Sequence, residues 1–360
     1  MSYRVTLIPG DGVGPEVTEA TKRAVEATGV EFKWDVGIVG EEAQARFGTT
    51  LPEDVLTSIK KNGVALKGPV TTPIGTGFRS VNVALRQSLD LYASLRPCKI
   101  YPGAPTLFKD VDIVVVRENT EDLYAGIEYA RGTKVAERLI SFIESTGGPK
   151  IKKDSGFSIK MISESGSRRI VKFAFEYARA NGRKKVTAGH KANIMKFSDG
   201  LFLSVAQEVA KEYPDIAFDS LVIDALSMRL VRSPEAFDVL VLPNLYGDII
   251  SDLCAGLVGG LGLAPGANIG EGAVVFEPAH GSAPDIAGQN KVNPIAMMLS
   301  AVLMLRHLGE KSAADRLEKG IAKVIEEGTH VTFDLKLKQS GNIAGTSQVT
   351  DAIIKKMKED

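Results

Sequence analysis

Short apolar runs rich in β-branched residues alternate along this chain with stretches of helical periodicity, and this alternation restricts the possible folds more than any other feature. We expect strands at residues 3–8, 112–116, 186–190, 220–224, 239–243 and 273–277. We expect helices near 166–181, 200–212, 294–307 and 312–327, with Ser312 as the N-cap and Gly328 as the terminating glycine of the last one. Such alternation is typical of α/β layering and argues against a helix bundle or an all-β sandwich.

The first strand leads into residues 10–15 (GDGVGP), followed by a helical stretch that ends before Gly29. This segment is similar to a dinucleotide-binding turn, but its third glycine comes too early for GxGxxG. The glycine spacing therefore departs from the dinucleotide-binding fingerprint. The sequence therefore predicts a tight turn that opens a helix at Pro15, and not a Rossmann phosphate loop.

The overall composition argues against several classes of protein. Lysine and arginine together number 44, as do aspartate and glutamate, so no global field favours nucleic acid or an anionic membrane. Residues 253–268, the least charged stretch, contain five glycines and Pro265, so no transmembrane helix is expected. Cys98 and Cys254 form no CxxC pair and no secretory leader is visible, which favours a cytoplasmic location.

Two aspartates spaced by four residues follow the strand at 239–243. Asp248 and Asp252 share one face of a helix start, where their charges repel each other. A divalent cation such as Mg²⁺ or Mn²⁺ would relieve this repulsion, and Asp224, after another strand, could add a third oxygen ligand. The spacing alone fits an N-cap aspartate and an exposed helix acid equally well.

Arginines are concentrated in the segment that ends at residue 117. Each guanidinium group can donate two charge-assisted hydrogen bonds to a carboxylate, so a set of them favours a small polycarboxylate ligand. Any one of them alone would be interpreted as a solvated surface residue, and only the combination with the aspartate pair favours a site. The set comprises Arg79, Arg86, Arg96 and Arg117, with Ser80 and Asn82 among them and the turn Thr71-Thr72-Pro73 nearby.

Residues 277–288 place His280 and Asp285 among small and turn-forming residues after a strand. Small residues let backbone amides approach a ligand such as a nucleotide, although an irregular loop with a structural histidine explains the segment almost as well. Lys191 and Tyr124 carry no signal of their own, because a lysine after a strand and a tyrosine after a polar turn are usually surface or packing residues.

Together these segments resemble the β-decarboxylating dehydrogenases, that is, the isocitrate/isopropylmalate dehydrogenase family, and within it the NAD-type isocitrate dehydrogenases. The resemblance covers nearly the whole chain. It rests on residues 9–15 (PGDGVGP), 68–73 (GPVTTP), 79–86 (RSVNVALR), 91–97 (LYASLRP), 117–121 (RENTE), 190–195 (HKANIM), 244–252 and 280–294.

The resemblance implies a fold of two α/β lobes around a central cleft. The large, cofactor-side lobe would comprise residues 1–95 and 255–360. The small lobe would comprise residues 96–254, including the dimer interface and an intersubunit clasp near 122–163.

The resemblance also implies an activity, namely oxidative decarboxylation of isocitrate to 2-oxoglutarate and CO₂ with hydride transfer to NAD, assisted by Mg²⁺ or Mn²⁺. Lys191 resembles the general base at the 2-hydroxyl and Tyr124 the general acid at C3. In the family, the residues matching Lys191 and Asp224 reach the site from the neighbouring subunit, which implies a homodimer with shared active sites.

The remaining roles follow from the same resemblance. Substrate contacts are implied for Ser80, Asn82, Arg86, Arg96, Arg117 and Asn193, and metal ligation for Asp224, Asp248 and Asp252. Cofactor contacts are implied for Thr71, Thr72, Glu277, His280, Gly281, Ser282, Ala283, Asp285, Ile286 and Asn293.

Differences within the family indicate substrate and cofactor. Members that use 3-isopropylmalate carry apolar side chains in place of Ser80 and Asn82, and these polar groups would be left unbonded against an isopropyl unit. Members that use NADP carry Lys-Tyr in place of Asp285-Ile286, with a Tyr and an Arg in place of Phe333 and Leu337. Because Asp285 would repel a 2′-phosphate, the sequence favours isocitrate and NAD.

Other functions remain open at this point. Homoisocitrate is one methylene longer than isocitrate and would undergo the same chemistry, and Ser80 and Asn82 argue against it only weakly. A catalytically silent regulatory subunit would share the fold but lose active-site residues, whereas every matched position is intact here. A nucleic-acid-binding role has no basic patch or aromatic platform to support it.

Overall fold

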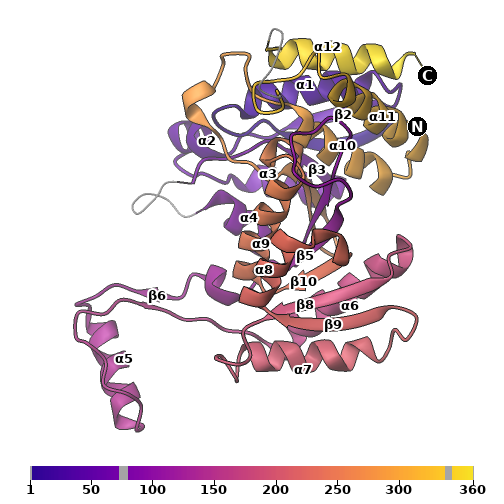
Figure 1. The fold of residues 1–360 in the computed structure, drawn as a ribbon. Coiled ribbons are helices and arrows are strands. Elements are labelled where there is room, and N and C mark those ends of the chain that lie inside the picture. Colours follow the sequence, from indigo (N-terminus) through magenta and orange to yellow (C-terminus); the bar gives the residue numbers. More distant parts are fainter. Residues whose placement is uncertain (1, 73–79, 337–342, 360) are drawn as a thin grey trace.

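The computed structural model describes residues 2–72, 80–336 and 343–359, which form one ten-stranded sheet covered by helices and a smaller two-stranded sheet (Figure 1). The order in the large sheet is β2-β1-β3-β12-β11-β4-β5-β10-β8-β9. The strands are β1 (Ser2–Ile8), β2 (Glu31–Val36), β3 (Val64–Lys67), β4 (Ala93–Lys99), β5 (Asp112–Glu118), β6 (Glu128–Tyr129), β7 (Phe157–Ser158), β8 (Lys185–His190), β9 (Ala217–Val222), β10 (Val239–Leu242), β11 (Pro265–Ile269) and β12 (Val274–Pro278).

Helices flank both faces of the large sheet (Figure 1). The α-helices are α1 (Gly14–Glu26), α2 (Gly40–Phe47), α3 (Glu53–Asn62), α4 (Val81–Ser88), α5 (Lys134–Ser145), α6 (Glu164–Ala180), α7 (Asp199–Ala210), α8 (Ile223–Arg232), α9 (Asn244–Leu257), α10 (Ile295–His307), α11 (Lys311–Glu327) and α12 (Thr346–Met357). Short 3₁₀ helices are η1 (Asp122–Ala125), η2 (Pro234–Ala236), η3 (Leu261–Leu263) and η4 (Pro284–Ile286). The α/β class is confirmed.

The large sheet is parallel in its two halves and antiparallel in between. Strands β2, β1, β3 and β12 pair in parallel, as do β5, β10, β8 and β9. Strand β11 runs antiparallel to β12 and β4, and β4 runs antiparallel to β5. The expected lobe boundaries fall inside β4 and inside α9. Strands from both expected lobes belong to one continuous sheet, so the division into lobes stays a prediction.

Burial on both faces explains the continuous apolar runs of the parallel strands. In β5, Val114 and Val116 belong to the core shared with α6, whereas Ile113 and Val115 belong to the core shared with α8 and α9. On the other half, α10 packs against β3, β11 and β12, and α3 packs against β1 and β3. No helix within the described ranges is long and apolar enough to cross a bilayer.

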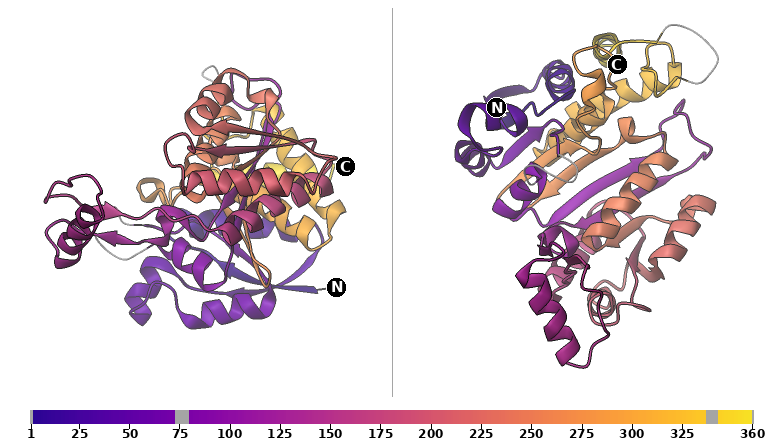
Figure 2. Two further views of the ribbon diagram at one scale, coloured as in Figure 1. Left: turned by 90° about the horizontal axis from the view of Figure 1, so that it is seen from below. Right: turned by 90° about the vertical axis from the view of Figure 1, so that its left-hand side faces the viewer.

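An arm made of β6, α5 and β7 projects from the body of the molecule (Figure 1, Figure 2). Strands β6 and β7 pair antiparallel, and Thr133 caps α5 by accepting a hydrogen bond from the Ala136 amide at 3.3 Å. Phe142 and Val135 both lie on α5, and they remain 65% and 48% exposed. The arm coincides with the segment expected to form an intersubunit clasp, and that role stays a prediction.

All the strands and helices expected from the sequence are present, with boundary shifts. The strand expected at 220–224 ends at Val222 because Ile223 and Asp224 already begin α8. The prediction of Ser312 as an N-cap is wrong: α11 begins at Lys311, and the Ser312 hydroxyl accepts from Arg316 inside the first turn. Gly328 ends α11 in the left-handed conformation, as predicted.

Candidate active site

A cavity of about 550 Å³ lies where parallel strands from both halves of the sheet end, beside α4 and α9. Ligands of open α/β sheets bind at the carboxyl ends of parallel strands, so the position fits a binding site. The predicted site residues that line it are Thr71, Thr72, Ser80, Asn82, Arg86, Arg96, Arg117, Tyr124, Asp248, Glu277, His280, Gly281 and Ser282. Arg79, Pro73 and Leu337 lie outside the described residues.

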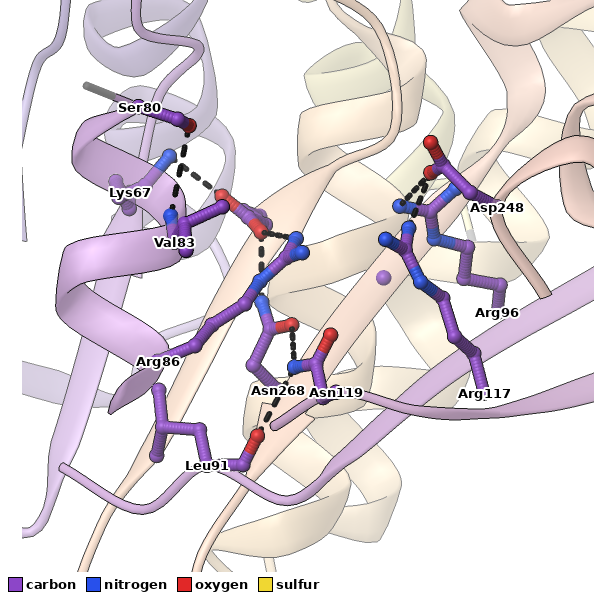
Figure 3. A network of polar contacts seen from close by, with 12 residues as sticks. Lys67, Ser80, Val83, Arg86, Leu91, Arg96, Arg117, Asn119, Asp248 and Asn268 are labelled. Atoms are coloured by element: carbon purple, nitrogen blue, oxygen red, sulfur yellow. Dashed lines mark hydrogen bonds and ion pairs between the residues drawn. The ribbon is translucent and has the colours of Figure 1, made fainter. Parts of the chain in front are cut away.

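Arg117 is the most deeply buried arginine of the cavity, with 1% of its surface exposed. Arg117 is the second-last residue of β5. Its Nε and Nη2 donate to the Asn244 amide oxygen at 3.0 and 2.8 Å. Its Nη1 binds Asp248 (Figure 3). Gly247 allows this close approach, because a Cβ there would lie 2.5 Å from Cγ of Arg117. The structure thus explains the glycine in the NLYGD segment.

Arg96 on β4 connects the two aspartates of α9. Its Nη1 donates to Ser251 Oγ at 2.6 Å and to Asp252 Oδ1 at 3.4 Å, and its Nη2 lies 3.6 Å from Asp248 Oδ1. Burial raises the pKa of Asp252, and the Asp248 carboxylate adds to the rise. Burial also opposes ionisation of Asp248, but Arg117 and Arg96 outweigh it and hold its pKa below the ordinary value.

Tyr124 lies in η1, and its hydroxyl donates to Asp248 Oδ2. The guanidinium carbon of Arg117 stands 4.8 Å from the centre of the Tyr124 ring, a cation–π distance. Burial raises the pKa of Tyr124, and the hydrogen bond with Asp248 raises it further. The phenol is therefore protonated at neutral pH, as a proton donor must be.

Arg86 lies in the last turn of α4 and binds Glu277 of β12. Its Nη2 donates to Glu277 Oε1 at 3.1 Å, and Lys67 Nζ lies 2.5 Å from Oε2 (Figure 3). Asn268 Nδ2 donates to the same carboxylate at 2.6 Å. Burial opposes ionisation of Glu277, but Lys67 and Arg86 outweigh it and hold its pKa far below the ordinary value. Glu277 thus fixes Arg86 through an ionised carboxylate.

Lys67 and Asn268 are absent from the residues predicted from sequence, although both are buried beside this site. Lys67 closes an otherwise apolar strand immediately before the Gly-Pro-Val-Thr-Thr segment. A buried lysine needs a partner, so this position could have signalled an ion pair. The position of Asn268 in the sequence gives no comparable indication.

The rim of the cavity is formed by three loops that bond to one another. Thr71 Oγ1 donates to Ser282 Oγ at 2.9 Å, and Thr72 Oγ1 donates to Ser80 Oγ at 3.2 Å. The Ser80 hydroxyl also caps α4 by accepting from the Val83 amide. The predicted tight turn at residues 10–15 packs here, since a Cβ on Gly12, whose φ is +60°, would lie 2.1 Å from the Ser282 carbonyl oxygen.

Three buried polar atoms of cavity-lining residues have no hydrogen-bond partner within the described chain: Asn82 Oδ1, Arg86 Nε and His280 Nε2. An unpaired buried donor or acceptor is costly, so such atoms indicate groups kept for a ligand. Four cations, Lys67 and the three arginines, face only two carboxylates in the lining, so the cavity is positive overall.

Other predicted residues lie beside the cavity and not in its lining. Asp252 borders it through Arg96. Ala283, Asp285 and Ile286 belong to the loop and to η4 next to the lining residue Pro284. Both ends of the Asn293 amide are already bonded, to Asp334 and to the Ile295 amide at the start of α10.

Lys191, Asn193 and Asp224 do not reach this cavity in a single chain. Lys191 follows β8 and Asp224 follows β9, two and three strands from β5 in the sheet order, which is roughly 10 and 14 Å along the sheet. The Lys191 ammonium binds the exposed Asp224 carboxylate, and this ammonium lowers the pKa of Asp224. Within the described ranges no three His, Cys, Asp or Glu side chains come together as a complete metal site.

Comparison with known proteins shows the family of the chain. The isocitrate/isopropylmalate dehydrogenase family model matches residues 4–353. The chain belongs to this family. Its α/β fold matches that of the crystal structure of isocitrate dehydrogenase from Methylococcus capsulatus, with a TM-score of 0.90 and 50% identity over 99% of each chain.

Curated relatives of this dehydrogenase family carry several names. A regulatory chain of the NAD isocitrate dehydrogenase of Dictyostelium discoideum is 48% identical over 99% of this chain and 92% of its own length. An Arabidopsis thaliana relative, named as a catalytic chain of the same enzyme, is 48% identical over 97% of this chain and 87% of its own length. A 3-isopropylmalate dehydrogenase of Solanum tuberosum is also 48% identical, over 90% and 86%.

Proposed function

We propose that this member of the dehydrogenase family oxidises and decarboxylates isocitrate, using NAD and Mg²⁺ or Mn²⁺. The observation that carries the substrate assignment is the presence of Ser80 and Asn82 in the same positive cavity as three arginines. The Ser80 hydroxyl, which accepts from Thr72 and Val83, and the Asn82 amide nitrogen can both donate to a third carboxylate, whereas an isopropyl group can accept from neither.

The proposed chemistry assigns a task to each side chain. Arg86, Arg96 and Arg117 would orient the carboxylates of the substrate, so that C2 and C3 are held in place. Lys191 would accept the proton of the 2-hydroxyl. After CO₂ leaves C3, the Tyr124 phenol would return a proton to that carbon, in keeping with its raised pKa.

The residues of the site fit both a divalent cation and NAD. Asp248 and Asp252 offer carboxylate oxygens of the kind that Mg²⁺ prefers, and the raised pKa of Asp252 reflects burial and a neighbouring negative charge that a cation would offset. The unpaired His280 nitrogen and the loop at 281–286 fit an adenine nucleotide, with Asp285 near its ribose. When bound, NAD would accept the hydride from C2 and the cation would stabilise the alkoxide and enolate oxygens.

A homodimer with shared sites is the second part of the proposal. It is supported by the separation of Lys191 and Asp224 from the cavity, which leaves the site in one chain without a base. It is also supported by the projecting arm, whose Phe142 and Val135 have no partner within the described chain that buries them. Contiguous exposed apolar side chains of this kind mark interaction surfaces.

We also propose that residues 1–95 with 255–360 form one lobe and residues 96–254 another.

We further propose that the protein works in the cytoplasm. The two cysteines are free and buried, which fits a reducing compartment. Fractionation of the source cells with an antibody would test the location.

The central experiment compares isocitrate, homoisocitrate and 3-isopropylmalate, each with NAD and NADP, on the purified chain. We expect the highest kcat/KM with isocitrate and NAD. Ser80→Asp should lower kcat/KM for isocitrate by at least about 100-fold, since a carboxylate there would repel the substrate, while leaving NAD binding nearly unchanged. A higher kcat/KM with either of the other acids, or no turnover by the wild type, would refute the substrate assignment.

A further inference from the structure

Two buried asparagines connect the arginine of α4 with the strand that carries Arg117. Asn119 follows the last residue of β5, and Asn268 lies in β11 in the middle of the sheet. They are 4% and 2% exposed and do not line the cavity, so neither can touch a ligand there. Figure 3 shows both asparagines between Arg86 and Arg117.

The contacts of these asparagines form a closed ring that begins and ends at Arg86. The Asn119 amide nitrogen donates to the Leu91 carbonyl at 2.9 Å and to Asn268 Oδ1 at 3.0 Å. Asn268 Nδ2 donates to Glu277 at 2.6 Å, and Glu277 accepts from the Arg86 guanidinium. The Leu91 amide donates to the Arg86 carbonyl at 2.9 Å. Both the backbone and the side chain of Arg86 are thereby held.

The chemistry of the ring permits one arrangement of its amides. The ionised Glu277 accepts only, so Asn268 must turn its nitrogen towards it and its oxygen towards Asn119. Asn119 must then donate with both of its N–H groups, which is what the Leu91 and Asn268 contacts require. The bonds from Asn119 to Asn268 and from Asn268 to Glu277 point the same way, so they polarise each other cooperatively and end at the carboxylate that binds Arg86.

We propose that Asn268 and Asn119 are positioning residues that fix the Arg86 guanidinium relative to Arg117 and so set the affinity for the carboxylates of the substrate. The proposal rests on the function proposed above, because Arg86 is taken to bind substrate. Glu277, which also pairs with Lys67, binds only the tip of the Arg86 side chain, whereas the ring also anchors the end of α4 to the end of β5.

The test is a double-mutant cycle on kcat and KM. Asn268→Ala should raise KM for the substrate by about 30-fold and change kcat by less than about threefold, and Asn119→Ala should raise KM by about tenfold. In an Arg86→Ala background, Asn268→Ala should change kcat/KM by less than about twofold, because the arginine it positions is gone. Asn62→Ala is the control: its amide donates to Thr6 at 2.9 Å and Asp35 at 3.0 Å outside the cavity, and its KM should be that of the wild type.

The assay uses whichever of isocitrate, homoisocitrate and 3-isopropylmalate the wild type oxidises, since all three share the 2-hydroxy acid with a carboxylate on C3. Failure of the proposed function would thus appear in the wild type, and failure of the ring only in the variants. An equal loss with and without Arg86, or an equal rise of KM in Asn62→Ala, would overturn the proposal. If Asn268→Ala does not fold, Asn119→Ala with and without Arg86 decides it in the same way.

Discussion

The arginine-lined cavity and the Lys191–Asp224 corner lie on the same edge of one sheet, yet they differ in how completely a single chain builds them. In the cavity, Arg117 and Glu277 are buried and held by several partners each, and the buried Arg86 guanidinium is held by Glu277. At the corner, the Lys191 ammonium pairs with the Asp224 carboxylate, and the Asp224 side chain is 69% exposed. Under the proposed function, one chain would prepare the binding of substrate carboxylates, and a second subunit would supply the base.

The largest expected effect tests that division directly. Lys191→Met should lower kcat by about 10³-fold without unfolding the chain, because a general base is lost. Lys172→Met, which removes a surface lysine paired with Glu176 at 3.7 Å, should leave kcat unchanged.

Mixing can show whether Lys191 acts across the interface. Inactive Tyr124→Phe and Lys191→Met chains are mixed in equal amounts, unfolded together and refolded. About half of the dimers are then mixed, and each mixed dimer has one intact site of two, so about a quarter of wild-type activity should return. Recovery of no activity from folded mixed dimers would mean that each chain supplies its own base, and the comparison above would fail.

Removing the buried negative charge of Glu277 should also lower the stability of the fold. Glu277→Gln should destabilise the fold by about 3–5 kcal/mol at pH 7, because it leaves the buried Lys67 and Arg86 without their carboxylate. The pKa of Glu277 is lower in the folded state than in the unfolded state. The ionised carboxylate therefore contributes to the free energy of unfolding above the unfolded pKa of about 4.3, and this contribution is lost as the pH falls through the folded pKa. Urea unfolding of both proteins from pH 7 downwards should show the difference shrink only below about pH 4. A difference independent of pH would contradict the ionised state.

The metal assignment also tests the comparison between the cavity and the corner. Of the proposed ligands, Asp248 and Asp252 belong to the cavity region and Asp224 belongs to the corner. Asp252→Asn should raise the Mg²⁺ concentration needed for half-maximal activity by about tenfold or more, since an amide is a weaker ligand than a carboxylate. Asp351→Asn, which alters an exposed aspartate paired with Arg23 at 2.6 Å, serves as the control. An unchanged Mg²⁺ titration of the Asp252 variant would remove this residue from the metal site.

The smallest effect is expected at the cofactor rim. Replacing Asp285 by Lys and Ile286 by Tyr should shift the ratio of kcat/KM for NADP over NAD by about tenfold without reversing the preference, because Asp285 is exposed and its field is screened by water. Phe333 would still offer a 2′-phosphate no hydrogen bond. A ratio unchanged from the wild type would show that Asp285 does not face the ribose.

Much of this architecture could be predicted because it depends on local pattern. Strands such as β5 are buried on both faces and therefore carry continuous apolar runs, and glycine ends α11 because the left-handed conformation costs it little. Elements whose pattern is weak are not predicted from the sequence, among them β4, β11 and α4. Strand β4 carries Arg96 inward and β11 carries Asn268, so two buried polar side chains interrupt the apolar signal.

The sequence by itself determined the α/β class, the family and the set of residue types that a polycarboxylate site needs. Only the tertiary structure decided which of these side chains meet. It joined Arg86, Glu277, Lys67 and Asn268 from four separate elements, and it kept Lys191 and Asp224 apart from them. The physical reason is that hydrogen bonds and ion pairs depend on distances of about 3 Å, which strand order and register set and which spacing along the chain does not encode.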